Sequence, residues 1–160
     1  EAAVPFRVEG RRVVPLRVAV PAEERAPAGR IRLVQGDLLD PPFEAESFAA
    51  VAAVSLLDTV ADPVVALGQL DALLAPGGLL LVGAPWSWDA RVTPPAAWWS
   101  GRDATGGDVL RALLAGRHPA LPHLGCELLE EADRATWAIP GHGRLVHRYA
   151  LELLLARKRG

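Results

Sequence analysis

Residues 48–84 read FAAVAAVSLLDTVADPVVALGQLDALLAPGGLLLVGA, and this stretch decides the fold class. Two nearly unbroken apolar runs, Phe48–Leu57 and Leu79–Ala84, stand at its ends. Apolar runs without alternation indicate strands buried on both faces, as in a parallel sheet covered by helices. The residues between the runs have helical spacing. The stretch therefore predicts a βαβ unit, whose crossover is right-handed in nearly all proteins.

The helix of this unit has clear start and stop signals. Asp62 is a good N-cap, and Pro63 suits the first helical position. Pro76-Gly77-Gly78 is expected to end the helix. The residues expected to face the sheet recur at helical spacing: Val64, Leu67, Leu70 and Leu74.

Further elements are predicted on the C-terminal side. Gly107–Ala115 is expected to form a second helix and Leu124–Leu129 a strand. Leu145–Ala156 has the leucine content of a helix, but its side chains roughly alternate, which favours a strand. Alternating strands and helices predict an α/β domain.

The N-terminal residues predict a β-hairpin. Val4–Val20 is rich in valine and alternates on both sides of a Glu9-Gly10 turn. Pro15 and Pro21 confine its second strand to an edge. A Pro/Ala/Glu-rich linker follows to Gly29, and Arg30–Asp37 is predicted to be a strand that ends in a Gly-Asp turn.

Composition excludes several classes of protein. The 160 residues suffice for one domain with a core, and 51% of them are hydrophobic. A net charge of -2 gives no nucleic-acid footprint. No apolar run reaches the ~20 residues of a membrane span. We therefore expect neither nucleic acid nor a membrane as partner, and a small molecule as substrate.

Cysteine and methionine usage adds two expectations. A single cysteine, Cys126, excludes an internal disulfide and fits a cytoplasmic, reducing compartment. His118 and His123 lie five residues apart, and so do His142 and His147. The metal-binding histidine pairs on helices of zinc enzymes lie four residues apart, so no metal site is expected. The chain has no methionine, and we expect the natural chain to extend upstream of residue 1.

Three segments resemble one family when they are taken in order. VQGDLL at 34–39 precedes PFEAESF at 42–48, AVSLLD at 53–58 precedes the helix start, and LLAPGGLLLV at 73–82 follows the helix. This order and spacing are similar to class I S-adenosylmethionine (SAM) methyltransferases. The resemblance implies a Rossmann-like SAM methyltransferase fold, N-terminally incomplete, with an inserted β-hairpin near the start. It divides the chain into a hairpin and linker over 1–29 and the C-terminal part of a methyltransferase domain over 30–160, with SAM as cofactor.

The resemblance also implies cofactor-binding residues. Asp37 would accept a hydrogen bond from the adenine amino group, and the backbone amide of Leu38 would face an adenine ring nitrogen. Ser55, Leu56 and Leu57 would contact the cofactor at the end of the next strand. The alternative interpretations are a turn or N-cap aspartate and ordinary packing at a strand end.

Four tryptophans follow the apolar run Leu79–Ala84 and lie within fourteen residues of one another. Trp86, Trp88 and Trp98 could form an aromatic box around a cationic or heteroaromatic methyl acceptor. Core or lid filling is the alternative for each ring. Methyl transfer needs a base only when the acceptor carries a proton, and the sequence does not rank the candidates: Asp58, His142, His147 and Tyr149.

A finer resemblance concerns the methyltransferase domain of ovothiol biosynthesis, which methylates an imidazole nitrogen of a mercaptohistidine. It rests on SLLD at 55–58, APWSW at 84–88, and Thr93-Pro94 followed by Trp98. The glycine-rich cofactor loop of the family is missing before Arg30.

Three hypotheses therefore stay open. The first is a truncated SAM-dependent methyltransferase with a small-molecule N, S or O acceptor. The second is a non-enzymatic module that pairs with itself or another chain through exposed strand edges. The third, a nicotinamide-dependent enzyme, is disfavoured because no glycine fingerprint occurs within the chain.

Overall fold

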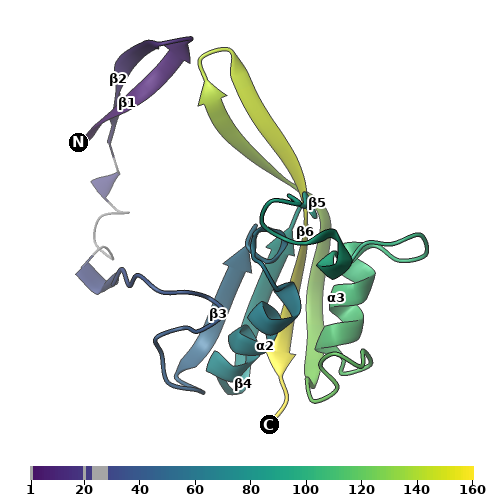
Figure 1. Ribbon diagram of the computed structural model, residues 1–160. Coiled ribbons are helices and arrows are strands. Elements are labelled where there is room, and N and C mark those ends of the chain that lie inside the picture. Colours follow the sequence, from purple (N-terminus) through teal and green to yellow (C-terminus); the bar gives the residue numbers. More distant parts are fainter. Residues whose placement is uncertain (1, 20, 23–28) are drawn as a thin grey trace. The chain divides into compact units, whose positions relative to one another are not determined.

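The computed structural model describes residues 2–19, 21–22 and 29–160. It divides into two compact units (Figure 1). One comprises Glu1–Gln35 and Trp137–Tyr149, and the other comprises Gly36–Thr136 and Ala150–Gly160. The linker expected over 21–29 lies mostly outside the described residues. The expected division into 1–29 and 30–160 stays a prediction.

The larger unit is built on a mixed four-stranded sheet with the order β3-β4-β6-β5. Strands β3 and β4 are parallel, and helix α2 connects them, which confirms the predicted βαβ unit. Strand β6 runs antiparallel to β4. The bounds of the elements are β3 Phe48–Val54, η2 Leu57–Thr59, α2 Pro63–Leu73, β4 Leu74–Ala84, η3 Pro95–Ala97, α3 Gly106–Leu114, β5 Cys126–His142 and β6 Leu145–Lys158.

Helix α2 begins as predicted but ends early. Asp62 Oδ1 accepts hydrogen bonds from the amides of Val64 and Val65, both at 3.0 Å. The helix ends at Leu73, so Leu74 is not a helical residue: its extended backbone (ψ 130°) pairs with Phe48 in the sheet. Pro76-Gly77-Gly78 therefore lies within β4, beside a register shift, and does not end the helix.

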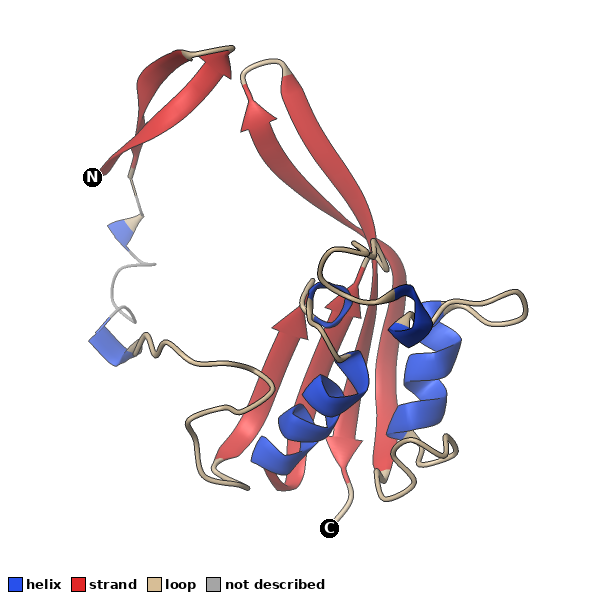
Figure 2. Ribbon diagram, in the orientation of Figure 1, coloured by secondary structure: helices blue, strands red, loops and turns tan. Residues whose placement is uncertain are grey.

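Both helices of this unit cover one face of the sheet (Figure 2). On that face Leu80, Val82 and Leu154 are fully buried against α2 and α3. On the opposite face Ala50 and Ala52 are exposed and Leu81 is half-buried. The prediction that these strands are buried on both faces is therefore wrong, because within this unit the helices supply only one layer.

The segment Arg30–Gly36 is not a strand, contrary to prediction. Ile31, Leu33 and Val34 are 66%, 97% and 56% exposed, and the segment forms no ladder with any described strand. A strand needs a neighbour for its backbone N–H and C=O groups. Alternation and β-branched residues alone do not hold this segment extended in a sheet.

The smaller unit contains the predicted hairpin. Strands β1 (Ala2–Glu9) and β2 (Arg12–Val18) pair antiparallel around a turn in which Gly10 has φ +49°. Pro15 lies inside β2, as expected for a strand with a free edge. The turn between β5 and β6 joins this unit through a Gly143 N–H donated to Arg7 O at 3.1 Å.

The C-terminal elements follow the sequence prediction in type. Helix α3 is displaced by one residue from its predicted bounds, and β6 is a strand and not a helix. Strand β5 runs to His142, much further than the predicted Leu129, since it pairs along the length of β6. None of the described helices is long and apolar enough to span a bilayer.

Candidate functional site

The parallel strands β3 and β4 end in strained backbone. Ser55 follows β3 with φ 52°, and Trp86 lies two residues beyond β4 with φ 53°. The left-handed region costs a residue with a Cβ roughly 1–2 kcal/mol. Such strain clusters at ligand sites, and ligands of open α/β sheets bind beyond the carboxyl ends of the strands. These two strand ends therefore mark the candidate site.

Four indole rings pack together beyond β4. Trp88 stacks on Trp86 and on Trp98, with ring centroids 6.1 and 6.3 Å apart. Trp99 packs 5.7 Å from Trp86 and 6.4 Å from Trp88, and it is 6% exposed. The structure thus brings together the three predicted acceptor residues and adds Trp99. We call these four residues the tryptophan cluster.

Two hydrogen bonds fix the segment 86–99, which carries the tryptophan cluster and which we call the lid. The buried Thr93 hydroxyl donates to Val60 O at 2.6 Å, which ties the lid to the loop after β3. Trp98 Nε1 donates to Thr93 O at 2.9 Å. Trp98 is therefore held by the stacking of its ring on Trp88 and by the hydrogen bond of its indole N–H.

Asp58 is the buried carboxylate of this region. It is 1% exposed, and its Oδ2 accepts the Ser87 amide at 2.7 Å. Its Oδ1 has no hydrogen-bond partner in the part of the chain that the structure describes, and the same holds for Nε1 of Trp88 and of Trp99. Burial raises the pKa of Asp58, although the hydrogen bond from Ser87 opposes the shift. An acid with a raised pKa is suited to proton transfer.

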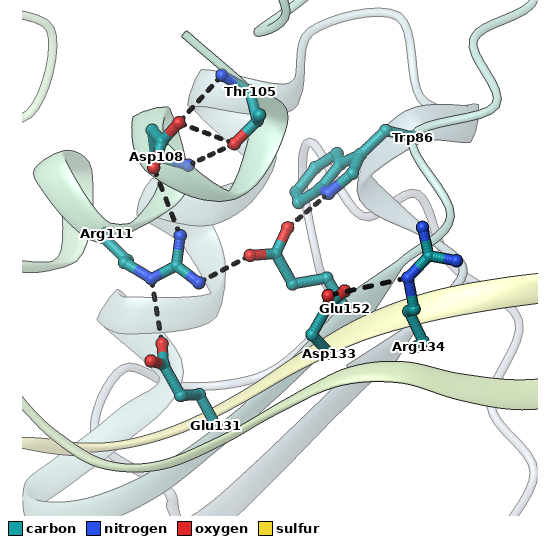
Figure 3. A network of polar contacts seen from close by, with 8 residues as sticks. All are labelled: Trp86, Thr105, Asp108, Arg111, Glu131, Asp133, Arg134 and Glu152. Carbon is teal, nitrogen blue, oxygen red and sulfur yellow. Dashed lines mark hydrogen bonds and ion pairs between the residues drawn. The ribbon is translucent and has the colours of Figure 1, made fainter.

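A polar network holds Trp86 from the other side (Figure 3). Trp86 Nε1 donates to Glu152 Oε2 at 2.9 Å, and Glu152 Oε1 accepts Arg111 Nη2 at 2.6 Å. Arg111 Nε also donates to Glu131 at 2.9 Å. The hydrogen bond to Glu131 is the largest cause of the raised pKa of Arg111, so this guanidinium stays charged. The network connects the cluster to α3, β5 and β6.

The start of α3 fits tightly against this network. Thr105 and Asp108 form a capping box at the helix N-terminus. A Cβ at Gly106 would collide with the Trp86 ring, and a Cβ at Gly107 would collide with the Glu152 carboxylate. Sequence reasoning missed Glu152; a charged residue within an apolar strand, together with a glycine pair at a helix start, was the available signal.

The predicted cofactor residues lie in two places of the larger unit. Ser55 and Leu56 are half-buried at the end of β3, whereas the side chain of Leu57 is 0% exposed and belongs to the core. Asp37 is exposed, and its Oδ1 accepts the Leu39 amide at 2.9 Å, as the turn interpretation predicts. Leu38 is half-buried and packs against the core. Their contacts with a cofactor stay predictions.

The four candidate bases are divided between the units. Asp58 lies in the larger unit with the tryptophan cluster. His142, His147 and Tyr149 belong to the smaller unit, where the rings of His147 and Tyr149 stack 6.5 Å apart. Within the larger unit, Asp58 is therefore the candidate that the structure brings to the site.

These residues fit one side of a SAM site. They supply two strained strand ends, an exposed aspartate in a turn and an aromatic wall. In this family a glycine-rich turn lets the backbone approach the cofactor closely. No such turn occurs within the 160 residues.

Comparisons with known proteins find a partial similarity to a methyltransferase domain. Residues 13–82 match the family model described as "Methyltransferase domain". No curated protein sequence matches the chain significantly. The family match covers β2, β3, α2 and most of β4, which includes the parallel βαβ unit.

Two solved structures share the fold at low identity, and a third is more distantly similar. The cyclase SpnF has a TM-score of 0.52 and 18% identity; the match covers 86% of this chain and 60% of SpnF. A structure that describes the conversion of a disulfide bond into a thioacetal group during echinomycin biosynthesis has a TM-score of 0.52 and 17% identity. The match covers 86% of this chain and 60% of that one. A SAM-dependent methyltransferase of Thermotoga maritima, titled a possible histamine N-methyltransferase, has a TM-score of 0.46 and 16% identity over 86% of this chain and 70% of that one.

The chain thus spans about 60% of the length of the first two of these structures. One of them is a cyclase and the other belongs to the formation of a thioacetal, so the shared fold does not specify the chemistry. The chain is thus a mixed α/β protein with a partial Rossmann-like sheet and an N-terminal hairpin, and part of it is similar to the methyltransferase family model.

Proposed function

We propose that this chain is a SAM-dependent methyltransferase domain that transfers a methyl group to a nitrogen, sulfur or oxygen atom of a small molecule. The tryptophan cluster at the carboxyl ends of two parallel strands is the observation that carries this proposal. The match of residues 13–82 to the methyltransferase family model supports it.

Each part of the site has a proposed role. Asp37 and Leu38 would hold the adenine, and the backbone at Ser55, Leu56 and Leu57 would line the cofactor. SAM supplies an activated methyl on a sulfonium when it is bound. The chain's own residues then contribute alignment of the acceptor, which is the largest part of catalysis for a reaction of this kind.

The acceptor would lie against Trp86, Trp88 and Trp98. Indole faces attract cations and stack on flat heteroaromatic rings. Asp58 Oδ1 is the group beside the cluster that could take a proton from the acceptor. The finer proposal, an imidazole nitrogen of a thiol-histidine, rests on the short aromatic and proline motifs at 84–98. The single buried Cys126 favours a cytoplasmic location.

Isothermal titration of the chain with S-adenosylhomocysteine tests the cofactor assignment. We expect micromolar binding that Asp37→Ala abolishes. Asp40→Ala is the matched control, because Asp40 lies in the same turn and accepts none of the proposed contacts. Absence of binding to a well-folded monomer would contradict the proposal, and so would equal loss of binding in both variants.

The edge strand β3 favours a second candidate function. Phe48–Val54 contains neither charge nor proline, and among the described strands only β4 pairs with it. Natural edge strands are normally protected from pairing with another chain by charged residues or proline. The alternative is therefore a non-enzymatic methyltransferase-like module that assembles through this edge. Concentration-dependent dimerisation, measured by sedimentation, together with no binding of S-adenosylhomocysteine, would favour this alternative.

A further inference from the structure

A pocket of about 340 Å³ lies between helices α2 and α3, on the helix-covered side of the sheet. Its volume is within the range of small-molecule sites. None of its lining residues is a carboxylate, a lysine or an arginine. The lining residues are Val64, Ala96, Ala97, Trp98, Trp99, Val109, Leu113 and His118.

Two indole rings form the aromatic wall, and they are held differently. Trp98 is fixed by its hydrogen bond to Thr93 O at 2.9 Å. Trp99 Nε1 is buried without a hydrogen-bond partner among the described residues. Only packing holds Trp99, so a small adjustment of its ring toward a ligand breaks no hydrogen bond.

His118 supplies the polar edge of the pocket. Its Nδ1 accepts the Ala120 amide at 3.2 Å. A neutral imidazole carries one ring N–H, so this bond places the proton on Nε2, on the opposite side of the ring from Ala120. The lining therefore combines flat apolar walls with one imidazole whose tautomer is set by the backbone.

We propose that this pocket binds a flat, uncharged, largely apolar small molecule that stacks on Trp98 and accepts a hydrogen bond from His118 Nε2–H. An anionic ligand would find no lysine or arginine in the lining, and its desolvation would oppose binding. A planar ring with one carbonyl oxygen satisfies both the walls and the donor. This site stands whether or not the chain binds SAM.

The test uses acetophenone and α-methylstyrene, which have the same shape but differ in whether a C=O or a C=CH2 group is present. The indole N–H signals of the five tryptophans are followed by ¹⁵N–¹H spectroscopy on the whole chain at pH 8, with no cofactor added. Trp98→Phe and Trp99→Phe assign the two signals. We expect saturable shifts at Trp98 and Trp99 with acetophenone and none at Trp137, which lies in the smaller unit.

His118→Phe keeps a flat ring and removes the donor. We expect it to weaken acetophenone binding about three- to tenfold, the value of one net hydrogen bond, and to leave α-methylstyrene unchanged. His123→Phe is the control, since His123 lies in the same loop but not in the lining.

Three results would overturn the proposal. They are the absence of saturable shifts, equal affinity of the two probes, and shifts that depend on protein concentration alone. The last would mean that a second copy fills the pocket.

Discussion

The two faces of the four-stranded sheet are made by the same strands but differ in what covers them. On one face Leu80, Val82 and Leu154 are 0% exposed beneath α2 and α3. On the other face Leu81 and Leu155 border an open hollow of about 190 Å³, and Ala52 is exposed. We call these the covered face and the open face.

The comparison shows that an apolar run in the sequence does not reveal whether a strand is buried on one face or on both faces. Successive residues of a strand point to opposite faces, so Leu80 and Leu81 differ only in the side of the sheet that they occupy. Each Å² of apolar surface removed from water contributes about 25 cal/mol, and the covered face supplies most of this term. Assembly then depends on what meets the open face.

The largest expected effect separates the two faces on adjacent residues of β4. Leu80→Ala should lower the free energy of unfolding by about 2–5 kcal/mol, because it leaves a cavity under α2. Leu81→Ala removes the same atoms from a half-buried position and should cost less than half as much. Urea denaturation of both variants measures the difference. Equal costs would show that the open face is covered in solution.

The next effect concerns how α2 is fixed to the covered face. Lys158 Nζ donates to Asp71 O at 2.8 Å and to Leu74 O at 3.2 Å, and it lies 3.3 Å from the Asp71 carboxylate. A cation that binds the last carbonyls of a helix also opposes the helix dipole. Lys158→Met should therefore destabilise the fold by about 1.5–3 kcal/mol, the value of hydrogen bonds to a charged group.

Arg157→Met is the matched control for this prediction. Arg157 is the neighbouring residue of β6, it is exposed, and its side chain alternates to the open face. Its loss should change the urea midpoint little. Similar losses in the two variants would argue against the role assigned to the contacts of Lys158.

A smaller effect should depend on pH. Burial raises the pKa of Asp58 above its ordinary 3.8, so the folded state holds this proton more tightly than the unfolded state does. Asp58 therefore contributes stability below pH 3.8, and this contribution is lost as pH rises through the folded-state pKa. Asn cannot ionise, and its carbonyl can still accept the Ser87 amide. The stability of Asp58→Asn relative to the parent should therefore rise between pH 3.5 and pH 7.

Urea midpoints at several pH values check this sign. Asp133→Asn is the matched control for the substitution itself, because the Asp133 side chain is 80% exposed. A relative stability of Asp58→Asn that stays constant with pH would show that burial does not raise the pKa of Asp58.

The sequence predicted the elements whose signals are local. The cap at Asp62, the Pro63 start and the Gly10 turn lie where capping and turn chemistry place them. The position of Trp86, Trp88 and Trp98 after an apolar strand also suggested that their rings could gather, and the rings stack in the structure. Such features depend on residues within a few positions of one another, so a single sequence contains the necessary information.

The features that failed depend on distant partners. Arg30–Gly36 has strand composition, but no described strand pairs with it. Leu74 continues the helical spacing, yet its pairing with Phe48 places it in the sheet. Glu152 looks like one polar position in an alternating strand, and only packing against Gly107 and Arg111 reveals its place under Trp86. Spacing along the chain does not encode these long-range contacts.

The smallest expected change in stability addresses the edge of the open face. Ala52 is exposed on β3 and lies opposite Leu81 in the parallel ladder. Ala52→Lys should change the free energy of unfolding by no more than about 0.5 kcal/mol, because the new side chain extends into water. It should nevertheless abolish any dimer formed through β3, since a lysine on an edge strand is a common protection against strand pairing. Sedimentation over a range of concentrations measures the association, and Ala72→Lys, at an exposed helical position, controls for the added charge. A dimer that survives Ala52→Lys but not Ala72→Lys would place the contact on the helices of the covered face, and the apolar edge of β3 would then need another explanation.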